Sequence, residues 1–581
     1  MKPEDIYSLM DVCLGKERPS VLIKNATLVD VYTRELLSET DIAMKGKYIA
    51  FVGKWKYGES DTELVIDAQG LYAIPGFIDG HTHFAYLVEP SESIRYAIPT
   101  GTTSIVTELM ELYPLLGLEG LLYFMDLLKG QPIKFFFTVP SAVFTQKSPK
   151  GMPEEDLSRL LSLQEVLGMG ESYWQGVLQE RGLFVPSMLK TRILNKTLEG
   201  HSAGARGERL LAYLCCGISS CHEPTNPQEA LERARLGLTV MIREGAVRRE
   251  LDSISEILRT DIDKRRFVLS SDGVDPEELL ERGYMDLLVN KAISLGVDPI
   301  SAIQMASLNV AEHFHMEGWV GGIAPSKFAD ILLSERLDGI RPKFVFSSGN
   351  LIAMDGKVLM EPRPIPKDER LICLPRVHRR FSGNDFILRT ATSPNVRAYT
   401  IHMVTDLVTQ METRDLAVKE GRIRWEEAQD LNLVAAIERR SDPDRFFVGL
   451  VSHFGLQKGA FACSAGWDTT DMIVIGRDEN DMATAANRVF DLKGGAVIVV
   501  DGRLVWELPM PILGIMSDSD LRRLVEAFKE MREILRTLGV KFRDPLLSLV
   551  TLSTSAIPFF RICHEGYVDL KSGKTLGLGT P

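Results

Sequence analysis

Residues 75–83 read Pro-Gly-Phe-Ile-Asp-Gly-His-Thr-His, and this stretch is the strongest indication of both the fold and the chemistry of the chain. The apolar run 71–78 that leads into this stretch is β-favouring and predicts a buried strand. His81 and His83 follow at its end, and side chains two apart on a strand point the same way. Neutral imidazole is the commonest metal ligand among side chains. The motif alone equally fits two solvated histidines in a loop, so the downstream sequence decides between the two interpretations.

Downstream of residue 71 the sequence alternates between apolar strand-like runs and helical patterns such as 227–236 and 276–294. Eight such alternations over about 250 residues are typical of a (β/α)8 barrel, an α/β fold. The predicted strands are 71–78, 102–107, 134–140, 166–171, 197–201, 217–222, 239–244 and 266–272.

The segments on either side of this region have a different pattern of apolar residues, and the change in pattern predicts three domains. Residues 1–70 and 320–365 carry short alternating runs and are expected to form one small composite β domain. Residues 71–319 form the predicted barrel, the proline- and charge-rich segment 361–376 a linker, and residues 377–581 a third, α+β domain. In the third domain an amphipathic helix is predicted over 519–539, with Ser517 or Ser519 as its N-cap and Gly539 at its end.

Composition sets limits on partners and location. The 581 residues are 45% hydrophobic and 25% charged, with a net charge of −12, so we expect no nucleic-acid or anionic-membrane partner. We expect no signal peptide and no membrane-spanning segment, since no apolar run approaches 18 residues. A cytoplasmic location is the default expectation. The seven scattered cysteines are expected to be reduced.

Active sites of such barrels lie at the carboxyl ends of the strands. The predicted strand ends carry four histidines out of ten in the chain, and two carboxylates: His81, His83, Glu171, His201, His222 and Asp272. This donor set suits two divalent cations with one carboxylate bridging them, an arrangement that activates water near neutral pH. Asp272 is the natural acid and base for moving the proton. Histidine and carboxylate ligands admit Mn, Fe(II) or Zn.

Longer segments resemble a known family. The motif at 75–83, Gly200-His201, His222-Glu223 and Asp272 resemble the amidohydrolase superfamily, and the closer resemblance is to adenine deaminases. It extends over most of the chain, through EGHSAG (199–204), YLCCGISSCHEPTNPQEALERARLGLTVMIREG (213–245), the segment 305–333, FGLQKGAFACSAGWD (454–468), GGAVIVVDGRLVWELPMPILGIMSD (494–518) and DPLLSLVTLS (544–553).

The resemblance implies a ligand set. His81, His83 and Asp272 would bind one metal ion, His201 and His222 the other, and a fourth-strand carboxylate would bridge them. Glu171 is the expected bridge and Glu111 its rival. Members of the family also commonly form homo-oligomers, so a dimer or larger assembly is expected.

The chain departs from the family pattern near the expected substrate. The family's DPHE reads Glu108-Leu-Met-Glu111 here, its DHE reads Cys221-His222-Glu223, and its HDSHN reads Trp467-Asp468-Thr-Thr-Asp471. No proposed metal ligand is lost, so an intact metal centre with altered specificity is expected.

Several further residues near the predicted strand ends have both a functional and a structural interpretation. Glu111, Glu223, Arg243 and Glu244 are candidate substrate-binding residues, although Arg243 and Glu244 equally fit a salt-bridged strand end, and Glu223 could orient a ligand instead. Trp467 and Asp468 could form part of a pocket wall. Cys221 fits a small apolar filler. The six other histidines receive no role: His313, His315, His378, His402, His453 and His564.

The leading hypothesis is a metal-dependent aminohydrolase that deaminates a purine base, with adenine to hypoxanthine plus ammonia as the reference reaction and attack by a metal-bridging hydroxide. The alternative keeps the site but opens a cyclic amide ring, as in xanthine or a hydantoin. A third hypothesis, a non-catalytic scaffold, is disfavoured because all six ligand-type residues are retained.

Overall fold

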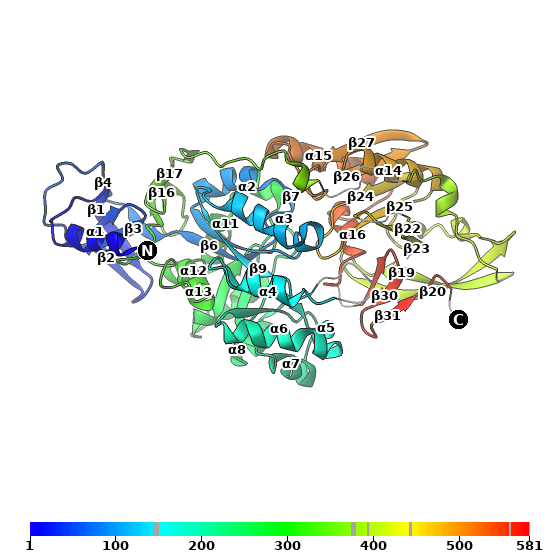
Figure 1. The fold of residues 1–581 in the computed structure, drawn as a ribbon, viewed down its shortest axis with the longest axis horizontal. Helices are drawn as coiled ribbons and strands as arrows, with labels where there is room; N and C mark the ends of the chain where they lie inside the picture. The colour runs from blue at the N-terminus through cyan, green and yellow to red at the C-terminus, as the bar shows by residue number, and fades with distance from the viewer. Residues whose placement is uncertain (143–149, 373–378, 392–393, 441–443, 557–558, 580–581) are drawn as a thin grey trace.

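The computed structural model describes residues 1–142, 150–372, 379–391, 394–440, 444–556 and 559–579. The molecule is elongated, with the N-terminal strands at one end of its long axis and the C-terminal sheets at the other (Figure 1). None of the helices in these ranges is long and apolar enough to span a membrane.

The first sheet combines strands from two distant parts of the sequence. Its order is β18-β17-β16-β15-β5-β1-β2-β3, with β4 paired to β1. Its apolar face packs around residues such as Ile23, Ile42 and Ile331, all fully buried. The bounds are β1 Val21–Asp30, β2 Glu35–Lys45, β3 Tyr48–Gly53, β4 Leu64–Asp67, β5 Tyr72–Pro75, β15 Ile331–Ser334, β16 Pro342–Ser347, β17 Asn350–Met354 and β18 Lys357–Val358. Helix α1 (Pro3–Cys13) packs on this sheet.

The predicted strand 71–78 is wrong as a single strand. The structure divides it at Gly76: β5 pairs with β15 in the first sheet, whereas β6 (Phe77–Thr82) pairs with β8 in a separate parallel sheet. A Cβ atom at residue 76 would lie 2.3 Å from the Thr103 hydroxyl, so only glycine fits where the chain crosses between the sheets. His81 therefore lies on a strand that begins immediately after this crossing.

The second architectural unit is a curled parallel sheet covered by helices, which confirms the predicted α/β class. One part has the order β11-β10-β9-β8-β6 and the other β12-β13-β14, with parallel pairing throughout. The two parts meet where the Ser219 amide donates to the Leu198 carbonyl (2.9 Å) and the Asp272 amide donates to the His81 carbonyl (3.0 Å). The bounds are β8 Thr102–Glu108, β9 Lys134–Val139, β10 Val166–Tyr173, β11 Thr197–His201, β12 Ser220–Cys221, β13 Thr239–Arg243 and β14 Phe267–Ser270.

The helices that follow these strands are α2 Pro90–Ala97, α3 Tyr113–Leu128, α4 Glu154–Leu161, α5 Trp174–Gln179, α6 Arg181–Ile193, α7 Gly207–Leu214, α8 Pro227–Arg235, α9 Leu251–Leu258, α10 Pro276–Glu281, α11 Met285–Ser294, α12 Pro299–Met305 and α13 Leu308–His313. The single helix predicted over 276–294 is wrong. It is α10 and α11, separated at Gly283, whose φ of 112° is incompatible with a continuous helix.

The C-terminal region contains a second nine-stranded sheet of order β21-β20-β19-β23-β22-β25-β24-β26-β27. Its strands are β19 Asn395–Met403, β20 Thr409–Lys419, β21 Arg422–Ile423, β22 Leu431–Glu438, β23 Phe446–Ser452, β24 Ala460–Cys463, β25 Asp471–Gly476, β26 Gly495–Val500 and β27 Arg503–Pro509. Helix α14 (Glu479–Asp491) packs on it, and a small sheet of β29 Phe560–Cys563, β30 Gly566–Asp569 and β31 Lys574–Leu576 lies beside it (Figure 1).

The C-terminal region contacts the parallel sheet and its helices at several points, including the pairing of two short strands and the packing of two helices. Strand β28 (Met516–Ser517) pairs with β7 (Leu87–Val88), just after the histidine motif. Helix α15 (Leu521–Thr537) packs on α10, where Arg532 pairs with Glu277 at 2.7 Å. Helix α16 (Pro545–Thr551) follows.

The predicted N-cap of the long C-terminal helix is wrong. Asp520 caps α15 by accepting from the Arg523 amide (3.0 Å), because Ser517 is already part of β28 and Ser519 lies one residue too early. Helix α15 ends at Thr537, and Leu538 is its C-cap. Gly539 follows with φ of 102°, which confirms the predicted glycine at the end of the helix.

A buried carboxylate, Asp79, ties β6 to the loop after β14. Its oxygens accept from the Ser271 amide (3.1 Å), the Ser271 hydroxyl (2.6 Å), the Tyr284 hydroxyl and the His81 amide (3.3 Å). Burial raises the pKa of Asp79, while these hydrogen bonds oppose the rise. The network fixes the backbone on both sides of His81.

Replacing Asp79 by alanine leaves these donors buried without an acceptor, which typically costs about 2–4 kcal/mol. We expect the midpoint of thermal unfolding to fall by roughly 3–8 °C in a calorimetric or dye-based melt. The exposed Asp261 provides the control, and Asp261→Ala is expected to melt with the parent protein. Equal midpoints for Asp79→Ala and the parent would contradict a structural role for this network.

Candidate metal centre and active site

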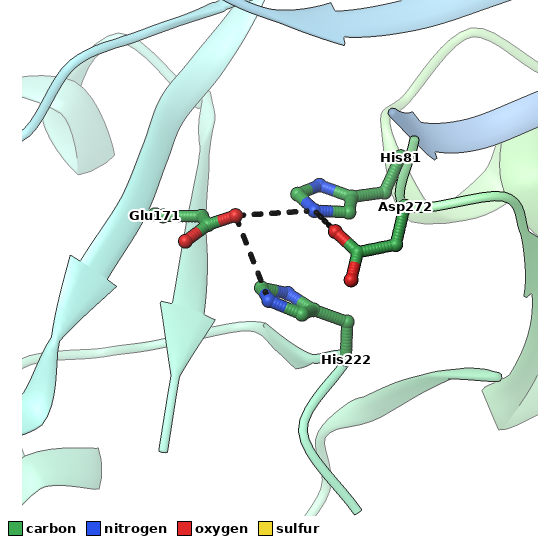
Figure 2. Close-up of side chains that lie close together, drawn as sticks. All are labelled: His81, Glu171, His222 and Asp272. Carbon is green, nitrogen blue, oxygen red and sulfur yellow. Dashed lines mark ion pairs between the residues drawn. The ribbon is translucent and has the colours of Figure 1, made fainter. Parts of the chain in front are cut away.

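The six strand-end residues named from the sequence converge in the structure. His81 is on β6 and His83 directly after it; Glu171 is on β10 and His201 ends β11; His222 follows β12 and Asp272 follows β14. All six side chains are buried, with 2–6% of their surface exposed. Figure 2 shows four of them, with the Glu171 carboxylate facing the ring nitrogens of His81 and His222.

Glu171 lies at the middle of the cluster. Its Oε1 is 3.1 Å from His83 Nε2, 3.4 Å from His81 Nε2 and 3.6 Å from His222 Nε2, while its Oε2 is 3.0 Å from His201 Nδ1. One carboxylate thus contacts all four imidazoles. Glu171 lies on β10, which is the neighbour of β11 in the sheet and is separated from β6 by β9 and β8.

Asp272 lies on the side of the first histidine pair. Its Oδ1 is 3.2 Å from His81 Nε2 and 3.5 Å from His83 Nε2, and its Oδ2 accepts from Arg243 Nη1 at 3.1 Å. The backbone of Asp272 is left-handed, with φ of 51°, a conformation that costs free energy in any residue but glycine and is often found at functional sites. The hydrogen bond from its amide to His81 holds that conformation.

Glu111, the rival of Glu171, lies elsewhere. Its carboxylate contacts Nδ1 of His83, whereas Nε2 of the same ring faces Glu171 and Asp272. Glu111 is therefore placed to orient the His83 ring from behind, and Glu171 is placed between the histidines.

Two of the remaining candidates, Glu223 and Arg243, adjoin the cluster. Glu223 Oε1 is 3.2 Å from His222 Nε2 and 3.7 Å from His201 Nδ1, and it also pairs with Arg243. Although burial would raise the pKa of Glu223, the charge of Arg243 holds it well below its usual value. Arg243 is anchored on its other side by Glu250 (3.1 Å).

Glu244 is not brought into the site. It pairs with Lys291 of α11 at 2.8 Å and is not among the residues that line the cavity described below. Arg243 is the last residue of β13 and Glu244 follows it; successive residues of an extended chain point to opposite sides, so the two side chains separate. The salt-bridged strand end is the interpretation that fits Glu244.

Sequence reasoning missed Glu108, the last residue of β8. Its Oε1 is 3.5 Å from His81 Nδ1, and neither oxygen has a hydrogen bond of ordinary geometry within the described residues. Burial raises the pKa of Glu108 to about 8. Its position directly after the predicted strand 102–107 was the available signal.

A cavity of about 210 Å³ opens over the cluster. His83, Glu171, His201, His222, Glu223, Arg243 and Asp272 line it from the parallel-sheet side. The C-terminal region supplies Leu407, Val408, Trp467, Thr551 and Ala556 on the opposite side. Segments far apart in sequence thus cover the mouth of the site.

Other named residues have structural partners. Cys221 is buried, and its Sγ lies 2.9 Å from the Ser202 hydroxyl. Three of the histidines without a predicted role have polar partners outside the cluster: His313 with Glu199, His564 with Asp471 and His402 with Ser452. His378 lies outside the described residues.

The donor set fits divalent metal ions. Ligand atoms of His81, Glu171, His222 and Asp272 lie within 4.8 Å of one another, and those of His201, His222 and Glu223 form a second such group. Nε2 of His81 and Nε2 of His201 are buried without a hydrogen-bond partner among the described residues. Buried, unpaired imidazole nitrogens beside carboxylates are the arrangement that a cation satisfies.

The electrostatics of the cluster agree with this fit. Burial would lower the pKa of His81, but the neighbouring carboxylates of Asp272 and Glu171 raise it to about 10. Burial would raise the pKa of Asp272, but the neighbouring imidazoles of His81 and His83 hold it well below its usual value. Both shifts reflect carboxylates that stay ionised and require positive charge beside them.

Histidines and carboxylates gathered at the carboxyl ends of a curled parallel sheet define the class of metal-dependent hydrolases. The chain is 34% identical to an adenine deaminase of Cenarchaeum symbiosum over 98% of its own length and 95% of the relative's. It is 31% identical to an adenine deaminase of Clostridium botulinum over 97% and 95% of the two lengths. Residues 406–574 match the family model of the adenine deaminase C-terminal domain. The chain belongs to the adenine deaminase family, which confirms the resemblance inferred from its motifs.

Among solved structures, a β-aspartyl dipeptidase of Fervidobacterium islandicum AW-1 superposes with a TM-score of 0.46 and 18% identity, covering 60% of this chain and 100% of the dipeptidase.

Proposed function

We propose that this protein is a metal-dependent aminohydrolase that converts adenine and water to hypoxanthine and ammonia. The observation that carries the proposal is the convergence of four imidazoles on one buried carboxylate, Glu171, in a chain that belongs to the adenine deaminase family. We propose two divalent ions, Mn, Fe(II) or Zn. His81, His83 and Asp272 would hold one and His201 and His222 the other, with Glu171 touching both.

When bound, the ions would lower the pKa of water and polarise the carbon that bears the exocyclic amine. The chain itself handles the proton. Asp272, which lines the cavity, would accept a proton from the attacking water and deliver it to the departing amine nitrogen. Arg243, at 3.1 Å from Oδ2, orients the carboxylate and, after His81 and His83, contributes to the lowered pKa of Asp272. The C-terminal residues over the cavity limit access of bulk water.

We further propose that the parallel strands close into a (β/α)8 barrel, expected over residues 71–319 and beginning with β6 at Phe77, because β5 belongs to the first sheet. Hydrogen bonds between the first and eighth strands (Asp272 to His81) and across the fifth and sixth (Ser219 to Leu198) support closure of the sheet. We place the composite β domain at 1–75 and 320–365, beyond the predicted boundary at residue 70 because β5 belongs to its sheet, and the C-terminal domain at 377–581. A cytoplasmic location and a homo-oligomer stay predictions.

The test is release of ammonia from adenine by purified protein loaded with Mn, Fe(II) or Zn. We expect stoichiometric ammonia and hypoxanthine, and loss of activity after chelation that returns when metal is restored. A product that gains the mass of water without releasing ammonia would instead favour ring opening of a cyclic amide. Inactivity toward adenine with a fully metallated centre would refute the deaminase proposal.

A further inference from the structure

The C-terminal region places one aromatic side chain, Trp467, against the proposed metal centre. Its ring is stacked on that of His83, with centroids 5.7 Å apart and planes 16° apart, and it also contacts Tyr86 at 5.6 Å. Trp467 lines the cavity over the cluster and also a smaller cavity of about 60 Å³ beside α15. The indole therefore forms a wall between the two cavities.

The loop that carries Trp467, between β24 and β25, is held by hydrogen bonds on both sides of it. The Ser464 hydroxyl donates to the Gly514 carbonyl at 2.7 Å. Asp468 Oδ2 accepts from the Ser555 amide at 2.6 Å, and the hydroxyls of Thr469 and Ser553 lie 3.0 Å apart. The position of the indole is thus fixed before a ligand enters, which reduces the entropy lost on binding.

One atom of this side chain lacks a partner. Trp467 Nε1 is buried and has no hydrogen-bond partner among the described residues. An indole N–H can only donate, and leaving such a donor buried and unpaired costs free energy that an incoming acceptor recovers. His83 and Tyr86 already contact the ring, so the polar edge is the part of the indole left to recognise a ligand.

We propose that Trp467 is a substrate-recognition residue whose Nε1–H donates a hydrogen bond to a ring nitrogen of the heteroaromatic substrate. The proposal rests on the proposed function, because it takes the cavity over the cluster as the substrate site. It assigns to the C-terminal region a direct part in selecting substrates that present an acceptor at that edge.

The test combines a protein change with a substrate change. Trp467→Phe keeps an aromatic ring against His83 but removes the donor, and we expect kcat/KM for adenine to fall about 10- to 100-fold at unchanged metal content. The three deazaadenines each lack one of the ring nitrogens at positions 1, 3 and 7. For one of these analogues, the ratio of kcat/KM between the parent and Trp467→Phe should approach 1, because the acceptor that Trp467 would bind is already missing. For analogues that are not turned over, dissociation constants from calorimetry give the same ratios.

Controls separate this inference from folding and from the proposed function. Trp319→Phe, in a different cavity that contains Lys134 and Phe328, is expected to match the parent. Trp467→His, which retains a ring N–H, is expected to recover part of the loss.

If the parent releases no ammonia from adenine, the deaminase proposal fails on its own, and the Trp467 inference is then decided by the dissociation constants for adenine. Equal constants for parent and Trp467→Phe, or the same loss with all three deazaadenines, would overturn it. If Trp467→Phe does not fold, the parent alone decides, since equal affinity for all three analogues and adenine also overturns it.

Discussion

Asp272→Asn is expected to lower kcat for adenine deamination by about 10³-fold, since proton transfer by a positioned carboxylate contributes on this order. Asparagine is nearly isosteric, tolerates the left-handed backbone found at this position, and retains one oxygen for metal binding. The variant should therefore fold and keep most of its metal while losing the group that carries the proton. Ammonia release and metal content, measured on the same preparation, check both parts.

The matched control is Asp61→Asn. Asp61 also has a left-handed backbone, with φ of 69°, but it is exposed and far along the chain from any strand end that carries a ligand. It is expected to retain parental activity. If Asp272→Asn kept more than a tenth of the parental kcat, Asp272 would not be the group that moves the proton.

Glu171→Gln is expected to have the other large effect, because this one carboxylate touches all four imidazoles. Replacing it removes the negative charge between the two proposed ions. We expect both metal occupancy and kcat/KM to fall, the latter by at least about 10³-fold, since the ions contribute several kcal/mol to such reactions. Elemental analysis after metal loading gives the occupancy.

Glu111→Gln provides the comparison that separates the two candidate bridges. Glu111 contacts only the outer nitrogen of His83, and loss of such an orienting partner typically costs about 10- to 100-fold in metal affinity or activity. We expect it to retain more metal than Glu171→Gln. The reverse order of metal loss would assign the bridge to Glu111.

The ligand cluster was accessible from sequence because strand periodicity and strand ends are local properties. His81, His201, His222 and Asp272 each lie at the end of a predicted strand, and in a parallel sheet those ends share one edge. The same local reasoning was wrong at residues 71–78, because the run is broken only by Pro75-Gly76, and this break does not by itself reveal that the chain changes sheets there. It was also wrong over 276–294, where the single Gly283 was absorbed into a helical pattern.

Other parts of the site depend on packing between distant segments, which a local pattern does not encode. Glu244 adjoins Arg243 in sequence, yet it pairs with Lys291 of α11 and does not line the cavity. Glu108 directly follows a predicted strand, but its contact with His81 is visible only in the structure. Leu407, Thr551 and Ala556 cover the cavity because of how the C-terminal region packs against the parallel sheet and its helices. No sequence motif predicts that packing.

The division of the cavity walls between two regions has an evolutionary consequence. The groups expected to perform the chemistry are inherited with the parallel strands, whereas the short segment 464–470 is anchored separately by its own hydrogen bonds. Mutations in that segment can therefore change which molecule is accepted while the reaction chemistry is conserved. Relatives that share all six ligands can then differ in substrate specificity while keeping one mechanism.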